Sequence, residues 1–329
     1  MLRVAMLSGW HVHAKGYANR IRGYEDAEIA AVWDEEPERG QAWAEELGVP
    51  FEDDLEVACG MEDVDAVVVD APTNLHPQVM VAAAEAGKHI FTEKVMALTV
   101  AECERIAAAV REAGVKFCIS MPARCSSANQ FARQVAEEKL IGELTLMRVR
   151  MAHNGAVADW LPPHFYDIEA CGGGAMMDLG AHPMYLARWI CGAPKRISST
   201  FNTLTDRAVE DNAVCVIEFA SGAVGVVETA FVSTHSPGCL ELYGTEGTLL
   251  VGGAEGGVRL RSNRLESLVP GWIAPSDLPK AQPEPLRQWV TACLSDAEPP
   301  FTLDDGIQLT ELMEAAYIAH NEGRQVEFS

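Results

Sequence analysis

The 329-residue sequence has few positive charges, no long apolar run and no closely paired cysteines. Its 25 Lys and Arg are outnumbered by 48 Asp and Glu, and the net charge is −23. Because nucleic-acid binding depends on clustered Lys and Arg, we expect no nucleic-acid partner. No apolar run reaches the roughly 18 residues that a membrane span needs, so we expect no membrane partner. The N-terminus also lacks the apolar core of a secretory signal.

The nine cysteines are odd in number and never spaced C-x-x-C. This pattern argues against a disulfide framework and against a zinc knuckle, and it favours reduced thiols. We therefore expect a cytoplasmic protein.

What the sequence does contain is a regular alternation of strand-like and helix-like segments over its first 120 residues. The predicted strands are 2–7, 27–33, 66–70, 89–92 and 115–119, and the predicted helices are 14–23, 36–47, 76–86 and 100–113. Three helices end near Gly48, Gly87 or Gly114, where a left-handed cap favours glycine. The alternation predicts an α/β fold, a Rossmann-type doubly wound parallel sheet.

The pattern changes after about residue 122. A helix is predicted over 129–139 and a strand over 145–153, followed by a long loop, a helix that ends near Cys191, and a series of short strands from 196 to 261. A closing helix is predicted over 307–320. The short, hairpin-spaced strands predict a second, α+β domain with a large, mostly antiparallel open sheet. We therefore expect two domains, residues 1–122 and 123–329.

The first predicted strand runs into "MLSGWHVHAKG", residues 6–16. A strand–turn–helix of this kind binds a diphosphate with backbone N–H groups, but Ser8, Trp10 and His13 stand where the G-x-G-x-x-G pattern has glycines. Asp34 ends the second strand 25 residues after Gly9. An acidic residue there binds the adenosine ribose and repels a 2′-phosphate, which favours NAD over NADP. The alternative is that Asp34 only caps the helix before Pro37.

Polar residues also follow the third and fourth strands of the predicted sheet. Ala71, Pro72, Thr73 and Asn74 follow one strand, and Glu93 and Lys94 follow the next. The carboxyl ends of parallel strands meet at one crevice, so we expect these residues beside the nicotinamide end of a dinucleotide. The alternative for Glu93 and Lys94 is a solvated surface pair.

These motifs resemble the Gfo/Idh/MocA family, which includes glucose-fructose oxidoreductase and inositol 2-dehydrogenase. The matching motifs are Pro72-Thr73-x-x-His76, Glu93-Lys94-Val95, Arg124, "GGGAMMDLGAHPMYLARWICG" (172–192), "YGTEGTLLV" (243–251) and "DDGIQLTELMEAAYIAHNEGRQVEF" at the C-terminus. Val95 replaces the usual proline, and Trp10 stands at a position that is commonly glycine. The resemblance implies a dinucleotide-binding domain, then a domain that binds substrate and assembles through its sheet into a homodimer or homotetramer.

The resemblance also implies a Lys, an Asp and a His around a reacting hydroxyl group, which are Lys94, Asp178 and His182 here. Asp178 and His182 are four residues apart and would share a face if this stretch is helical, although Pro183 fits only a first turn or a kink. In this interpretation His182 removes the hydroxyl proton, Lys94 stabilises the oxygen and Asp178 holds the imidazole. The alternative is that Asp178 is a helix cap and His182 a packed residue.

The full set of predicted site residues is larger. For the cofactor it comprises Ser8, Gly9, Trp10, His11, Val12, His13, Asp34, Ala71, Pro72, Thr73, Asn74, His76, Glu93, Lys94 and Arg124. For the substrate it comprises Lys94, Arg124, Asn154, Trp160, His164, Asp178 and His182, with His153 as a weaker candidate. Trp160 and Phe165 have packing as an alternative role. His11 and His13 have the spacing of a metal pair, but no third ligand lies nearby in sequence, so we expect no metal.

The predicted function is an NAD-dependent oxidoreductase that moves a hydride between nicotinamide and a secondary hydroxyl of a sugar, polyol, inositol or related small molecule. One alternative is an NAD-dependent glycosidase or lyase that uses transient oxidation, which would produce no net NADH. Another is a non-catalytic dinucleotide sensor. The sequence leaves the substrate and the direction of reaction open.

Overall fold

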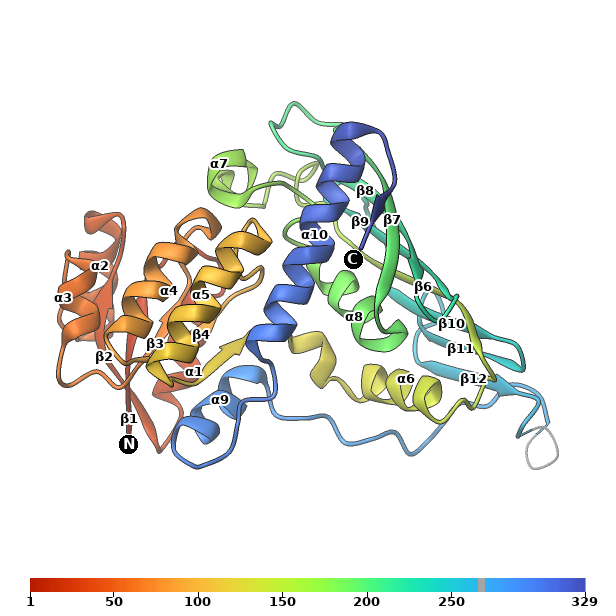
Figure 1. Ribbon diagram of the computed structural model, residues 1–329, viewed down its shortest axis with the longest axis horizontal. Coiled ribbons are helices and arrows are strands. Elements are labelled where there is room, and N and C mark those ends of the chain that lie inside the picture. Colours follow the sequence, from red (N-terminus) through yellow and green to blue (C-terminus); the bar gives the residue numbers. More distant parts are fainter. Residues whose placement is uncertain (266–269, 329) are drawn as a thin grey trace. The chain divides into compact units, whose positions relative to one another are not determined.

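The computed structural model describes residues 1–265 and 270–328 (Figure 1). The chain divides into two compact units. The first comprises Met1–Ser120 and Pro283–Thr310, and the second comprises Met121–Gln282 and Glu311–Ser329. Within the described ranges, no helix is both long enough and apolar enough to cross a lipid bilayer.

The first unit is built on a parallel five-stranded sheet in the order β2-β1-β3-β4-β5. Its strands are β1 (Leu2–Leu7), β2 (Ala27–Trp33), β3 (Ala66–Val69), β4 (His89–Thr92) and β5 (Phe117–Ile119). Its helices are α1 (Ala14–Arg22), α2 (Pro37–Leu47), α3 (Leu55–Gly60), α4 (His76–Glu85), α5 (Val100–Ala113), α9 (Pro285–Cys293) and the first part of α10 (Leu303–Glu322). Every residue of β3 is buried, as expected for a central strand covered on both faces. The predicted doubly wound sheet is confirmed.

Local sequence signals fix several helix ends in this unit. Gly48, Gly87 and Gly114 have φ values of 75°, 73° and 65°, so all three predicted left-handed positions are confirmed. Helix α5 begins with a capping box, in which Thr99 and Glu102 each bond the other's backbone N–H.

One segment of the first unit comes from late in the chain. Helix α9 places Trp289, which is fully buried, against Phe91 of β4 with ring centroids 5.7 Å apart. Arg287 donates two 2.7 Å hydrogen bonds to Asp26. The predicted division at residue 122 therefore differs from the observed units, because residues 283–310 were assigned to the second domain. These long-range contacts leave no local sequence pattern.

The second unit is built on an eight-stranded sheet in the order β12-β11-β10-β6-β9-β8-β7-β13, in which only β6 and β9 pair in parallel. Its strands are β6 (Leu144–Ala152), β7 (Pro194–Asn202), β8 (Asn212–Phe219), β9 (Val224–Ala230), β10 (Cys239–Gly244), β11 (Gly247–Gly252), β12 (Val258–Ser262) and β13 (Val326–Glu327). Its helices are α6 (Ser127–Glu137), α7 (Ile168–Cys171), α8 (Ala181–Cys191) and the second part of α10. The predicted large, mostly antiparallel sheet is confirmed.

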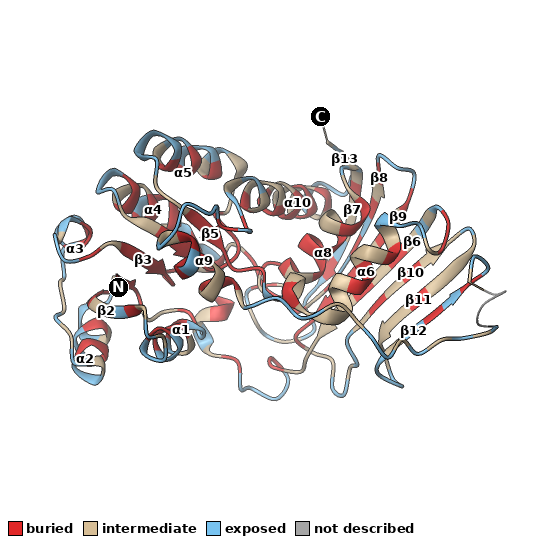
Figure 2. Ribbon diagram, turned by 90° about the horizontal axis from the view of Figure 1, so that it is seen from below, coloured by how far each residue is buried: buried red, intermediate tan, exposed pale blue. Residues whose placement is uncertain are grey.

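The two faces of this sheet differ in burial. Along β8 the residues alternate, with Cys215 and Ile217 fully buried while Val214 and Val216 are 37% and 44% exposed. Helices α6 and α8 lie on the buried side (Figure 2). The opposite face therefore presents valine side chains to the surface of this chain.

Candidate active site

The β1–α1 loop keeps the tight turn of a dinucleotide loop without its first glycine. Ser8 is fully buried and has φ +80°, a conformation that usually requires glycine. Its backbone N–H bonds the Trp33 carbonyl at 2.7 Å, and its hydroxyl accepts the Trp10 N–H at 3.1 Å. At the next position a Cβ would lie 3.2 Å from the ring of Trp43, so Gly9 allows the loop to pack closely against that side chain. The loop is therefore a tight turn in which the N–H groups of Gly9, Trp10, His11 and His13 all bond acceptors of the first unit.

Asp34 lies directly after β2 and is tied to this loop. Its buried carboxylate accepts the N–H of Gly9 and the N–H of Glu36, each at 2.8 Å. Arg39 adds two further bonds to the same carboxylate, at 2.9 and 2.5 Å. The N-cap of α2 is Glu36, so the alternative role of Asp34 as that cap is wrong.

The loops after β3 and β4 are fixed to each other by His76. This buried ring lies 3.0 Å from the Ala71 carbonyl through Nε2, and 3.1 and 3.2 Å from the Val95 and Met96 carbonyls through Nδ1. Because both nitrogens face backbone carbonyls, we assign the His76 ring to positioning these loops rather than to contacting the cofactor. The peptide bond between Lys94 and Val95, where the family motif usually has proline, is cis.

Glu93 is buried and connected to several polar groups, so the alternative that it belongs to a solvated surface pair is wrong. Tyr17 donates its hydroxyl to Oε1, the Lys94 N–H donates to Oε2 at 3.1 Å, and Tyr17 also lies 2.8 Å from the Ser120 hydroxyl. Although burial acts to raise the pKa of Glu93, the neighbouring positive charges of His11, Lys94 and His13 lower it to about 2. Glu93 is therefore an ionised carboxylate directly beside Lys94.

Glu93 also changes the assessment of the two loop histidines. Potential metal-ligand atoms of His11, His13 and Glu93 all lie within 4.8 Å of one another. The prediction of no metal rested on the absence of a third ligand nearby in sequence. The fold supplies that ligand from the end of β4, so this argument against a metal is wrong.

In the second unit, Glu210 and Tyr317 hold the glycine-rich segment that precedes Asp178. The Glu210 carboxylate accepts the N–H groups of Gly174 and Met176 at 2.9 Å, and the Tyr317 hydroxyl at 2.6 Å. A Cβ at Gly174 would lie 2.1 Å from the Glu210 carbonyl oxygen. This segment therefore needs glycine for close packing. Asp178 follows it and lies in a turn.

The relation predicted between Asp178 and His182 depended on a helix through both residues. Helix α8 begins at Ala181, so Asp178 lies before it and the shared-face argument is wrong. The same boundary places Pro183 in the first turn, where proline is tolerated. The charge of Asp178 also acts on His153, whose pKa is lowered by burial although this neighbour acts to raise it.

His182 is connected to the loop that carries Arg124. Its Nδ1 lies 2.9 Å from the Tyr185 hydroxyl, which also accepts the Ala123 N–H at 3.0 Å. The Arg124 guanidinium stacks 5.1 Å over the ring of Trp189. Tyr185 thus links two of the predicted site residues, His182 and Arg124, through one hydroxyl and one backbone group.

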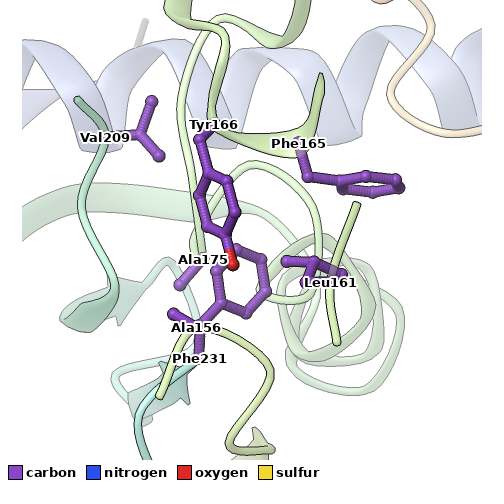
Figure 3. Close-up of a cluster of buried hydrophobic side chains, with 7 residues drawn as sticks. All are labelled: Ala156, Leu161, Phe165, Tyr166, Ala175, Val209 and Phe231. Atoms are coloured by element: carbon purple, nitrogen blue, oxygen red, sulfur yellow. The ribbon is translucent and has the colours of Figure 1, made fainter. Parts of the chain in front are cut away.

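The predicted substrate loop is partly packed and partly exposed. Phe165 is buried with Leu161, Tyr166 and Phe231 in a hydrophobic cluster (Figure 3), so Phe165 packs. Trp160 is 55% exposed, and its indole N–H donates to Asn154 Oδ1 at 3.2 Å.

Two imidazole rings flank this packed cluster. The His153 ring stacks on Phe231 at 4.9 Å and approaches Trp160 at 4.7 Å. His164 is half-buried, with its ring 4.9 Å from that of Phe165. The structure therefore brings His153, Asn154 and Trp160 together.

The predicted site residues divide between the two units. Those from Ser8 to Lys94 lie at the carboxyl ends of the first sheet, while Arg124, Asn154, Trp160, His164, Asp178 and His182 lie in the second unit. The grouping of Lys94 with Asp178 and His182 stays a prediction.

Sequence reasoning missed Tyr17, Asp70, Tyr185 and Glu210. Two of these carried usable signals: Asp70 is an acid at the end of an apolar strand, and Tyr185 lies three residues after His182, within one helical turn. The other two are tied to the site by long-range contacts.

Comparison with known proteins finds a matching family model for each of the two units. Residues 7–121 match the family model described as "Oxidoreductase family, NAD-binding Rossmann fold", and residues 129–250 match "GFO/IDH/MocA C-terminal domain". The 1,5-anhydro-D-fructose reductase of Ensifer adhaerens is 29% identical over 85% of each chain. The scyllo-inositol 2-dehydrogenase (NAD(+)) of Bacillus subtilis (strain 168) is 30% identical over 74% of this chain and 70% of its own. The solved structure of GenD2 from gentamicin A biosynthesis, in complex with NAD, is 26% identical with a TM-score of 0.84, over 100% of this chain and 96% of that one.

Proposed function

Because the chain belongs to the GFO/IDH/MocA family of oxidoreductases with an NAD-binding Rossmann fold, we propose that it interconverts a secondary hydroxyl and a carbonyl on a sugar, polyol or inositol. The resemblance in the sequence, the enzyme class and NAD as the cofactor are confirmed by these matches. The substrate class follows the names of the relatives, which act on an anhydro sugar and an inositol.

The observation that carries the cofactor assignment is the buried carboxylate of Asp34, bonded to Gly9 N–H at 2.8 Å. It stands where the adenosine ribose of a dinucleotide is bound, and its charge disfavours a 2′-phosphate. NAD, when bound, supplies the acceptor or donor of the hydride. The residues that would hold it are Ser8–His13, Asp34, Thr73, Asn74 and the Glu93–Lys94 pair.

The chain's own groups supply the proton chemistry. His182 takes the hydroxyl proton in the oxidative direction and returns it in the reductive direction, because an imidazole titrates near neutral pH. Lys94 donates a hydrogen bond to the substrate oxygen as negative charge develops on it. Asp178 is assigned to orienting the reacting groups, while Arg124, Asn154, Trp160 and His164 are assigned to the substrate.

We also propose a homodimer or homotetramer in which the exposed sheet face is covered. Val214 and Val216 on that face would leave water on assembly, which is favourable. A cytoplasmic location agrees with nine cysteines that are all free thiols.

The test combines cofactor binding with turnover. NADH and NADPH are titrated by fluorescence, and purified protein with NAD is then screened against sugars, polyols and inositols by following NADH absorbance. NADH-preferring binding and stoichiometric NADH formation are expected. Turnover without net NADH would favour the glycosidase or lyase, NADH binding without turnover would favour the sensor, and failure to bind either nucleotide would overturn the proposal.

Variants test the assigned roles. Lys94→Met and His182→Ala should abolish turnover, and His182→Ala, which lies outside the cofactor set, should leave NADH binding intact. Their matched controls are Lys195→Met and His235→Ala, since both side chains lie outside the proposed site and His235 is exposed. Full turnover by either active-site variant would contradict the role assigned to the residue that it replaces.

A further inference from the structure

The β1–α1 loop places two histidines against a buried carboxylate from a distant strand end. His11 and Glu93 are buried and His13 is exposed, and their ligand atoms lie within 4.8 Å of one another. An H-x-H segment with a carboxylate is a donor set typical of sites for transition-metal ions. The two histidines lie in the loop between β1 and α1, and Glu93 directly follows β4, so the cluster lies at the carboxyl edge of one sheet.

The carboxylate of this cluster is held in place by two donors of the first unit. Tyr17 donates to Oε1, and the Lys94 backbone N–H donates to Oε2 at 3.1 Å. Each carboxylate oxygen has a second lone pair, so these bonds orient Glu93 without using up its capacity. Orientation of a ligand by such neighbours is usual in metal sites.

A second, independent observation concerns Asp70 at the end of β3. Its side chain is fully buried, and neither carboxylate oxygen has a hydrogen-bond partner among the described residues. Its backbone carbonyl accepts the His11 N–H at 3.0 Å, which places Asp70 next to the loop that carries both histidines. A buried polar group without a partner calls for a bound water or ion. A cation or its bound water beside Asp70 would supply such a partner.

We propose that His11, His13 and Glu93 bind one divalent transition-metal ion, with Zn²⁺ as the preferred occupant and Asp70 as the neighbouring carboxylate that balances its charge. Three protein ligands leave a fourth position for a water or an anionic oxygen. The β1–α1 loop lacks the usual glycines, and the whole chain has a net charge of −23. A bound ion would add positive charge at this loop.

Binding requires a defined local change. Metal binding requires neutral His11 and His13 rings, so a proton that gives either ring positive charge beside Glu93 must leave. His11 Nδ1 accepts the backbone N–H of His13 at 3.2 Å, and a neutral His11 ring in this position carries its proton on Nε2. An ion at Nε2 moves that proton to Nδ1 and ends this contact. Ligands about 2.0–2.1 Å from zinc stand closer together than 4.8 Å, so the exposed His13 must move inward.

The test uses the whole protein after removal of metals with a chelator. ZnCl₂ is titrated by calorimetry in a non-chelating buffer, and CoCl₂ is added separately so that its visible absorption reports coordination. We expect one tight site per chain, weakened at least about tenfold by His13→Gln and by Glu93→Gln. His235→Gln is the matched control, because it removes an exposed histidine elsewhere and should leave the affinity unchanged.

Circular dichroism of each variant separates loss of the site from loss of the fold. Because His13 is exposed, His13→Gln keeps the test decisive if Glu93→Gln fails to fold. Absence of zinc binding to the unmodified chain, or equal affinity in folded His13→Gln, would overturn the metal site. NADH binding is measured with chelator present, so the proposed cofactor and the metal site fail or succeed separately.

Discussion

The hydroxyl of Tyr185 lies 2.9 Å from Nδ1 of His182, one turn further along α8. The same hydroxyl accepts the Ala123 N–H at 3.0 Å, so it is fixed from a second direction. A group bound to one nitrogen of an imidazole determines which nitrogen carries the proton. Tyr185 therefore fixes the tautomer and the orientation of the His182 ring.

Replacing Tyr185 by Phe should slow turnover without weakening substrate binding. We expect kcat to fall about tenfold with KM nearly unchanged, because general acid–base catalysis contributes about 10²–10⁴-fold and only its tuning is lost. The acidic limb of the pH profile of kcat should also move. Tyr243→Phe, which removes a hydroxyl bonded to Glu241 in β10, is the control and should change neither. An unchanged pH profile in Tyr185→Phe would show that this hydroxyl only packs.

Gly174→Ala should destabilise the second unit. The new Cβ would lie 2.1 Å from the Glu210 carbonyl oxygen and 2.7 Å from Val209 Cγ2, so the backbone must shift. We expect a loss of about 3 kcal/mol in the free energy of unfolding, measured by urea denaturation. Gly60→Ala is the control, because a Cβ at this position meets nothing within 4 Å. Its free energy of unfolding should stay within about 1 kcal/mol of that of the parent protein. Equal effects of the two changes would contradict the packing described for the glycine-rich segment.

Glu210 should give this unit a characteristic pH dependence. Burial raises the pKa of Glu210 above its ordinary range, while hydrogen bonds from Tyr317 and backbone N–H groups act in the opposite direction. The folded state therefore binds the proton more tightly than the unfolded state. Its contribution to stability is present below the unfolded pKa and is lost as pH rises through the folded pKa.

Comparison with Glu210→Gln isolates this contribution. The stability of the parent protein relative to the variant should be greatest near about pH 4 and should decline toward about pH 7. Denaturation midpoints of both proteins across this range measure the difference. A difference that stays constant with pH would mean that Glu210 has an ordinary pKa in the folded chain.

The sequence predicted those features that depend on neighbouring residues. The bounds of β1, β2 and β4 follow from apolar runs that end at turn residues, and the left-handed positions of Gly48 and Gly114 follow from glycine after a helix. Asp34 was found because the spacing from the loop to the end of β2 is itself local to one βαβ unit.

The features that the sequence did not predict depend on contacts between distant segments. Glu93 reaches Tyr17 across 76 positions, and Trp289 packs on Phe91 from nearly 200 positions away. Ser8 adopts φ +80° because its hydroxyl and the β2 backbone hold it there, and no propensity indicates this for serine. The four-residue spacing of Asp178 and His182 would place both on one face only in a helix, but the glycine-rich segment bonded to Glu210 forms turns and α8 begins at Ala181.

Asp34→Asn should weaken NADH binding and reduce the preference over NADPH. The parent carboxylate is fixed by the N–H groups of Gly9 and Glu36, and it presents negative charge where a 2′-phosphate would lie. The neutral amide removes that repulsion, and its NH₂ group, which can only donate, replaces one of the two oxygens that accept the N–H groups of Gly9 and Glu36. Arg39, which now bonds Asp34, is then available to a phosphate. We expect NADH affinity to fall about tenfold while NADPH affinity rises, measured by parallel fluorescence titrations.

Glu36→Gln is the matched control for this change. Glu36 also bonds Arg39, at 2.9 Å, but its side chain is 63% exposed and lies outside the loop contact with Gly9. Removing this charge should leave the affinity for NADH within about twofold of that of the parent protein, since exposed ion pairs contribute little to stability or binding. If both variants shift the preference equally, the discrimination comes from the general negative charge around Arg39. If only Asp34→Asn does, it comes from the buried carboxylate that the β1–α1 loop holds in place.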